Sequence, residues 1–197
     1  GDTLVATTFP SGDRTLAAGT VSGGALTVDA AGPEAWLRRD DPVPLLRKEF
    51  ALADKEIARA RVYSSARGVY RLHLNGKRVG DDELAPGWTS YDMRIDSQTY
   101  DVTDLVRAGD NAFGAEVAGG WYTGKIAMFG PNTYGTDTSL IAQLRVDYTD
   151  GTSAVVGTDG SWRTTDGPVR EADFLDGESY DRRRADAIGD WLDASYE

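Results

Sequence analysis

Short segments in which apolar and polar residues alternate recur along the chain. Such a period of two is typical of β-strands that bury one face and expose the other. The pattern is clearest over residues 140–148 and returns over residues 58–62, 70–74 and 113–117. These segments therefore predict four half-buried strands. Their apolar positions are Ala58, Ala60, Val62, Tyr70, Leu72, Leu74, Phe113, Ala115, Val117, Leu140, Ala142, Leu144, Val146 and Tyr148.

Turn chemistry separates the predicted strands. Asn75-Gly76 and Asp150-Gly151 each lie between two strand-like segments and supply the positive φ angles that tight hairpins require. The segment 101–106 reads as one short helical turn, opened by an acidic or hydroxyl cap and closed by Gly109.

Many short strands, frequent glycine turns and almost no helical periodicity predict an all-β fold, specifically a jelly-roll sandwich of two antiparallel sheets. Residues 1–42 carry fewer strand signals and more glycine, and we expect them to add strands and loops to the sandwich. Residues 43–182 form its main part. Residues 183–197 then read as a linker towards a following domain.

Composition narrows the possible partners. The net charge of -11 disfavours binding to nucleic acid and to anionic membranes, so a neutral ligand is favoured. A chain of this acidity is also expected to be a monomer. The chain has no cysteine and one histidine, His73, so only oxygen ligands could hold a metal ion. No apolar run has the length of a membrane helix, and the first ten residues lack the features of a signal peptide.

One acidic loop and one glycine-containing loop are candidates for a calcium site. Asp81 and Asp82, with Glu83 beside them, follow a predicted strand, where short carboxylates can converge on a hard cation. Calcium needs more oxygens than these residues supply, so a second loop must contribute. The carbonyl of Pro131 and the side chain of Asn132 are the best donors. The alternative is an exposed acidic turn without a ligand.

Aromatic residues in loops supply the second ingredient of a sugar site. Trp88, Trp121, Tyr122 and Tyr134 all lie in or beside predicted loops, where a ring can pack on the apolar face of a sugar. For Trp88 and Trp121 the alternative is a structural role, because Pro-Gly-Trp and Gly-Gly-Trp turns also tuck a ring over the end of a sandwich.

The order of short motifs resembles one family. A strand ending in Leu-Asn-Gly is followed by Val-Gly, an acidic pair, Pro-Gly-Trp-Thr, Tyr-Asp-Val-Thr-Asp-Leu-Val and Gly-Trp-Tyr. In these respects the chain is similar to the non-catalytic β-sandwich domains of bacterial α-L-rhamnosidases of glycoside hydrolase family 78. The matching positions are Leu74–Gly76, Val79-Gly80, Asp81-Asp82, Pro86–Thr89, Tyr100–Val106 and Gly120–Tyr122.

The resemblance implies a galactose-binding-like sandwich within a larger secreted enzyme. Some domains of this type are carbohydrate-binding modules of family 67, which bind terminal L-rhamnose through calcium. The resemblance places Asp81 and Asp82 at ion and sugar, with further oxygens from the Asn132 loop. Asp82 stands where the family has Asn, and a second carboxylate binds calcium more strongly but donates no amide hydrogen bond.

Three function classes follow for this chain. The favoured one is a calcium-dependent module that binds L-rhamnose or rhamnose-capped plant glycans beside the catalytic domain of its parent enzyme. The runner-up is a structural spacer with no sugar site. An enzyme is disfavoured, because the resemblance places catalysis in a separate (α/α)6 barrel that a β-rich chain of 197 residues does not contain, so we expect no catalytic residue here.

Overall fold

The computed structural model describes residues 3–4, 14–16, 19–22, 25–28 and 42–196. The chain divides into two compact units, Gly1–Arg39 and Asp40–Glu197. The first unit contains a four-stranded antiparallel sheet in the order β1-β4-β3-β2. Its strands are β1 (Thr3–Leu4), β2 (Arg14–Leu16), β3 (Gly19–Ser22) and β4 (Ala25–Val28). Whether these strands extend the sandwich stays a prediction.

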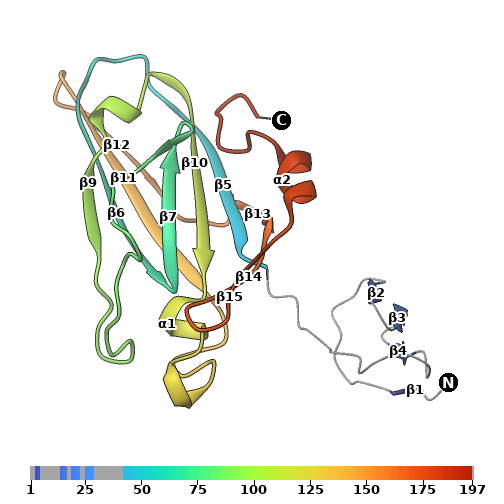
Figure 1. Ribbon diagram of the computed structural model, residues 1–197. Helices are drawn as coiled ribbons and strands as arrows, with labels where there is room; N and C mark the ends of the chain where they lie inside the picture. Colours follow the sequence, from blue (N-terminus) through green and yellow to red (C-terminus); the bar gives the residue numbers. More distant parts are fainter. Residues whose placement is uncertain (1–2, 5–13, 17–18, 23–24, 29–41, 197) are drawn as a thin grey trace. The chain divides into compact units, whose positions relative to one another are not determined.

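The second unit is a sandwich of two antiparallel sheets that face each other, with a separate two-stranded ribbon at one side (Figure 1). The five-stranded sheet has the order β13-β5-β10-β7-β8, and the four-stranded sheet has the order β12-β11-β6-β9. The strands are β5 (Pro44–Leu52), β6 (Ile57–Arg67), β7 (Val69–Leu74), β8 (Lys77–Arg78), β9 (Gln98–Asp101), β10 (Gly109–Ala118), β11 (Ser139–Tyr148), β12 (Ser153–Gly157), β13 (Arg163–Asp166), β14 (Val169–Asp173) and β15 (Gly177–Tyr180). The predicted all-β sandwich is confirmed.

The core lies between the two sheets. Leu72 and Phe113 enter it from the five-stranded sheet, while Val62 and Leu144 enter it from the other sheet, and each is at most 1% exposed. Removing one such side chain from water contributes about 1.5–3 kcal/mol, so these alternating positions dominate the stability of the unit.

One alternating position does not face the core. Ala58 is exposed, although Ala60 and Val62 on the same strand are fully buried. The pairing between β6 and β11 shifts here, since Asp147 pairs with Arg59 whereas Tyr148 pairs with Ile57. This irregularity interrupts the alternation, so the expectation that Ala58 packs inward is wrong.

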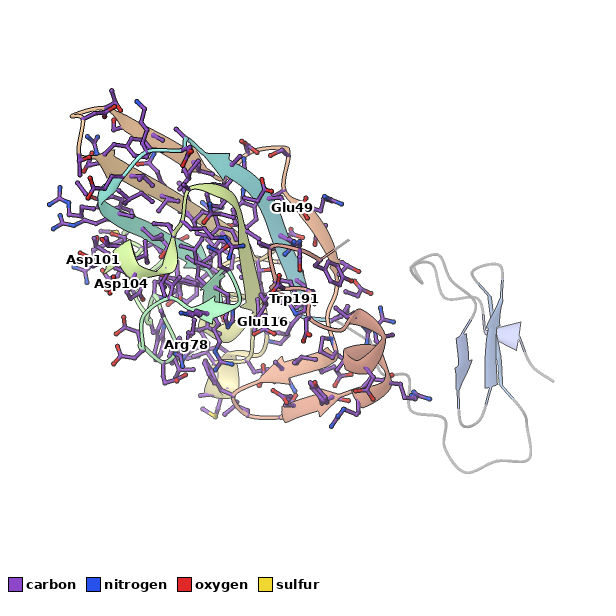
Figure 2. The ribbon with its side chains drawn as sticks, turned by 90° about the horizontal axis from the view of Figure 1, so that it is seen from above. Glu49, Arg78, Asp101, Asp104, Glu116 and Trp191 are labelled. Atoms are coloured by element: carbon purple, nitrogen blue, oxygen red, sulfur yellow. The ribbon has the colours of Figure 1, made fainter. Side chains whose placement is uncertain are left out.

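The predicted helical turn is a short 3-10 turn, η1 (Thr103–Leu105). The Asp101 carboxylate accepts hydrogen bonds from the backbone N–H of Thr103 at 3.0 Å and from its hydroxyl at 2.7 Å. An acidic opening of the turn was expected, but the N-cap residue is Val102, which makes no side-chain capping bond. The turn ends at Leu105, and Gly109, with φ 75°, instead begins β10. Asp101 and Asp104 lie close together at one edge of the unit (Figure 2).

The residues after β15 fold back onto the sandwich. Helix α2 (Arg182–Ile188) is followed by a segment whose Trp191 carbonyl accepts a hydrogen bond from the buried guanidinium of Arg47 at 2.6 Å. The same guanidinium lies 5.4 Å from the ring of Tyr196. The stretch expected to be a linker thus packs against β5 as far as it is described. Among the described residues, no helix is long and apolar enough to span a membrane.

Candidate functional site

A cluster of aromatic side chains lies at the end of the sandwich that carries helix α1 (Gly120–Thr123). The rings of Trp88 and Trp121 are almost parallel, at 7°, with centroids 6.0 Å apart. The indole N–H of Trp88 donates to the hydroxyl of Tyr134 at 3.4 Å. Tyr91 packs edge-on against Tyr122 at 5.2 Å and against Tyr134 at 5.0 Å. The structure therefore brings the four predicted aromatic residues together.

Close backbone approach places the rings carried by α1. Gly120 has φ 51°, and a Cβ atom there would lie 2.7 Å from the side chain of Val69. Likewise, a Cβ atom at Gly135 would lie 2.5 Å from the hydroxyl of Tyr122, whose ring is buried. Both positions therefore require glycine, and the Gly-Gly-Trp-Tyr sequence exposes Trp121 more than Tyr122.

The loop that contains Asn132 is fastened to the same helix. The backbone N–H of Asn132 donates to the carbonyl of Thr123 at 3.0 Å, and that of Tyr134 donates to the carbonyl of Tyr122 at 3.4 Å. Pro131 and Asn132 are exposed. The polar atoms of this loop therefore lie beside the aromatic cluster.

Trp88 is presented by a turn with its own internal bonds. Gln98 donates to the carbonyl of Pro86 at 3.2 Å, and the hydroxyl of Tyr91 donates to the carbonyl of Gly87 at 3.1 Å. Trp88 remains 54% exposed despite its contact with Trp121. An indole that is fixed on one side and open on the other can stack on a ligand.

One further ring joins the cluster. Phe174 lies between β14 and β15 and contacts Trp121 with centroids 4.5 Å apart. The residue was not among the predicted site residues. The only sequence signal for this role is an apolar Phe-Leu pair within the acidic turn 173–176. The sequence does not reveal the contact with Trp121, because it joins segments about fifty residues apart.

Two side chains of the acidic loop have partners outside the aromatic cluster. The carboxylate of Asp82 accepts a hydrogen bond from the hydroxyl of Tyr100 at 2.9 Å, and its carbonyl accepts one from Arg78 at 2.7 Å. Glu83 pairs with Arg78 at 2.8 Å and with Arg71 at 3.6 Å. Hydrogen bonding to Arg78 holds the pKa of Glu83 below its usual value. Asp81 is exposed and forms no hydrogen bond with any described residue.

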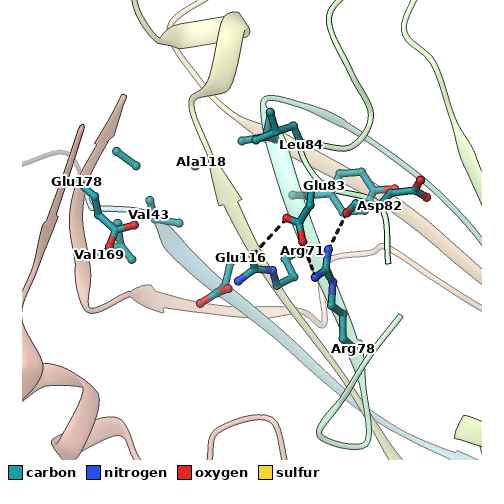
Figure 3. Close-up of a pocket in the computed structure, with 13 residues that line it drawn as sticks. Val43, Arg71, Arg78, Asp82, Glu83, Leu84, Glu116, Ala118, Val169 and Glu178 are labelled. Atoms are coloured by element: carbon teal, nitrogen blue, oxygen red, sulfur yellow. Dashed lines mark hydrogen bonds and ion pairs between the residues drawn. The ribbon is translucent and has the colours of Figure 1, made fainter. Parts of the chain in front are cut away.

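Asp82 and Glu83 line a crevice of about 170 Å³ (Figure 3). Glu116 and Glu178 contribute further carboxyl groups to it, and burial raises the pKa of Glu116. None of the four predicted aromatic residues lines this crevice. Its walls are formed by Val43, Val69, Tyr70, Arg71, Arg78, Asp82, Glu83, Leu84, Glu116, Ala118, Val169, Ala172 and Glu178.

The oxygen donors expected to bind calcium do not form a dense carboxylate cluster. No group of three or more acidic or histidine residues suited to a metal ion occurs within the described part of the chain. No hydrogen bond or ion pair there joins Asp81 or Asp82 to the loop of Pro131 and Asn132. The chemical types of these donors nevertheless suit calcium, which prefers oxygen ligands. The Asp81 carboxylate is exposed, and the loop of Pro131 and Asn132 offers neutral oxygens.

The fold and the cluster define a β-sandwich domain that presents aromatic side chains at one end. Residues 55–197 match the model of the alpha-L-rhamnosidase N-terminal domain. An alpha-L-rhamnosidase of Streptomyces avermitilis is 54% identical over 142 residues, which cover 72% of this chain and 14% of the relative. An alpha-L-rhamnosidase from Alteromonas sp. is 46% identical over 138 residues, which cover 69% of this chain and 15% of the relative.

Solved structures agree. The alpha-L-rhamnosidase of Streptomyces avermitilis complexed with L-rhamnose superposes with a TM-score of 0.78 and 47% identity, over 88% of this chain and 17% of that one. The native α-L-rhamnosidase from Aspergillus terreus superposes with a TM-score of 0.75 and 36% identity, over 82% of this chain and 19% of that one. The chain belongs to the family of α-L-rhamnosidase N-terminal domains. It spans about 15% of the length of the curated relatives that it matches.

Proposed function

We propose that this domain is a non-catalytic part of a larger, secreted α-L-rhamnosidase and binds terminal L-rhamnose with the help of calcium. The observation that supports this most directly is the gathering of Trp88, Trp121, Tyr122 and Tyr134 beside the Asn132 loop. Membership of the rhamnosidase family suggests that the sugar is L-rhamnose.

The aromatic cluster suits the chemistry of rhamnose. This sugar has a methyl group at C6 and a face of C–H groups, which can stack on the exposed side of Trp88 while its hydroxyl groups bond elsewhere. Rhamnose has about 11 non-hydrogen atoms, and at roughly 0.4 kcal/mol per atom its binding free energy is about -4 kcal/mol. The expected Kd is therefore about 1 mM.

The proposed calcium ion would draw on two loops. Asp81 would supply a carboxylate, and Pro131 and Asn132 would supply neutral oxygens, while Asp82 would face the sugar on release of its bond with Tyr100. These residues provide fewer than the six to eight oxygens that calcium prefers, so hydroxyl groups of the sugar can complete the shell. Binding of sugar and ion would then depend on each other.

Calorimetric titration of L-rhamnose, with calcium and with excess chelator, tests the proposal. We expect binding near 1 mM with calcium and a loss of at least 10-fold on chelation or in Asp81→Ala. Asp54→Ala removes another exposed aspartate with no hydrogen bond to a described residue, and this control should bind like the wild type. Binding that ignores both the chelator and Asp81→Ala would refute the role of calcium.

The alternative is a structural spacer. It is favoured by the absence of an acidic cluster suited to a metal among the described residues and by the engagement of Asp82 with Tyr100 and Arg78. A spacer would bind no rhamnose in either titration. Hydrolysis of an aryl rhamnoside by the isolated domain would instead indicate an enzyme, and we expect none.

A further inference from the structure

The aromatic surface continues beyond the ring that the proposed rhamnose site uses. Trp121 is parallel to Trp88, with centroids 6.0 Å apart, and it also contacts Phe174 at 4.5 Å. No ring contact joins Trp88 to Phe174 within the part of the chain that the structure describes. Trp121 therefore links two exposed rings, one 54% and the other 42% exposed. This row is longer than a single sugar ring.

Phe174 is held in place by its neighbours. One carboxylate oxygen of Asp173 accepts the backbone N–H of Lys125 at 2.7 Å, and the other accepts that of Leu175 at 2.8 Å. The ammonium group of Lys125 forms an ion pair with Asp176. These bonds fasten the ribbon of β14 and β15 to the segment after α1, beside which it lies in Figure 1. A ring fixed in advance loses little entropy when a ligand stacks on it.

The charges beside Phe174 select against acidic ligands. Asp173 and Asp176 flank the ring in sequence, and the nearby cation, Lys125, is already paired with Asp176. The whole chain carries a net charge of -11. A carboxylate on the ligand would lose its hydration here beside two aspartates, so a neutral ring is favoured.

We propose that Trp121 and Phe174 form a second subsite, which takes the neutral hexose that precedes the terminal rhamnose. This inference rests on the proposed function. The terminal sugar stacks at Trp88, and the C–H face of the next sugar packs on the pair formed by Trp121 and Phe174. The domain then recognises the end of a neutral rhamnose-capped oligosaccharide and discriminates against one whose second sugar is a uronic acid.

Calorimetric titration in the presence of calcium can separate the two subsites. The ligands are L-rhamnose, a disaccharide of α-L-rhamnose on glucose, and the corresponding disaccharide on glucuronic acid. For the wild type, we expect the neutral disaccharide to bind about 5–10-fold more tightly than rhamnose, as stacking of one further ring provides. The acidic disaccharide should bind no more tightly than rhamnose.

Variants of the β14–β15 turn then locate the effect. Phe174→Ala should reduce the ratio of disaccharide to rhamnose affinity to about one, and Phe174→Trp should retain it. Leu175→Ala, the matched control, removes the exposed apolar neighbour of Phe174 and should leave the ratio as in the wild type. Circular dichroism of each variant verifies that it is folded.

The outcomes distinguish the two proposals. If the wild type binds rhamnose but gains nothing from the second neutral sugar, the second subsite is refuted while the proposed function stands. A gain that persists in Phe174→Ala, or that is equal for the acidic disaccharide, also refutes the subsite as described. If the wild type binds none of the three ligands, both proposals are wrong.

Discussion

The imidazole of His73 is the clearest case at the residue scale of a polar group that folding takes out of water. His73 lies on β7, and its Nδ1 atom is buried without a hydrogen-bond partner among the described residues. Burial, together with the nearby cations of Arg71 and Arg78, lowers its pKa to about 4. The folded domain therefore favours the neutral imidazole.

We expect a measurable acid sensitivity from His73. In the unfolded chain its imidazole takes up a proton near pH 6.5, but in the folded chain it does so only near pH 4. Between these values the unfolded state binds more protons, so the free energy of unfolding falls as the pH falls. The contribution is about 1–3 kcal/mol after allowance for partial exposure.

Urea unfolding at pH 7.5 and at pH 4.5 measures this contribution. Gln cannot take up the proton, so His73→Gln should lose less stability than the wild type over the same interval. The difference between the two chains isolates the histidine from the carboxyl groups, which both chains share. Equal losses in the two chains would show that His73 does not contribute.

Single residues show how far the sequence can predict this structure. The positive φ angles of Asn75 and Gly76 follow from their residue types, and the hairpin was predicted. The second role of Asn75 was not predicted, namely its side-chain bonds to Leu105 and to the buried Asn111, each at 2.8 Å. Backbone preferences are local, whereas such a partner depends on contacts across about thirty residues.

At the scale of elements, one carboxylate makes several of the bonds that hold the turn between β14 and β15. Asp173 accepts backbone N–H groups from Lys125 and Leu175, and that of Asp176 at 3.3 Å. We expect Asp173→Ala to loosen the turn, because a hydrogen bond to a charged group contributes about 1.5–3 kcal/mol. The amides of Lys125 and Leu175 should then exchange with solvent about 10-fold faster or more.

Hydrogen exchange followed by nuclear magnetic resonance gives this rate for each amide. Asp137→Ala is the control, because the Asp137 carboxylate accepts a hydrogen bond only from Thr136 among the described residues and lies outside the ribbon. Amides in the centre of β11 should be unchanged in both variants. Unaltered exchange at Lys125 and Leu175 in Asp173→Ala would contradict the assigned role.

Strands whose residue types alternate between apolar and polar were predicted, whereas strands without that sequence signal were not. β13 has four exposed side chains in a row, Arg163 to Asp166, and gives no periodic signal. It is a strand because its backbone pairs with β5, from Arg163 opposite Arg47 to Asp166 opposite Pro44. The conformation of such an edge strand is determined by pairing with its neighbour, so the sequence of the strand alone does not predict it.

At the scale of the whole molecule, the sandwich could be predicted but the meeting of its loops could not. Alternation identifies which face of each strand is buried, and a sandwich is one of the few arrangements that bury such faces against each other. The candidate site joins loops near residues 88, 121, 134 and 174. The composition of the first three indicated sugar binding, whereas the proximity of all four depends on the order of strands in both sheets. The roles of Asp81, Pro131 and Asn132 in metal binding stay predictions.

The division of the chain into two compact units predicts that residues 40–197 fold without the preceding ones. Every member of the main core cluster known from the described residues lies at or after position 46. A chain that starts at Asp40 should therefore unfold cooperatively, with a thermal midpoint within a few degrees of that of the full chain.

Leu144→Ala should destabilise both chains equally, by about 2–5 kcal/mol, since the cavity forms in the same core. Calorimetry of the four proteins checks this. An unfolded shorter chain would show that residues 1–39 complete the sandwich.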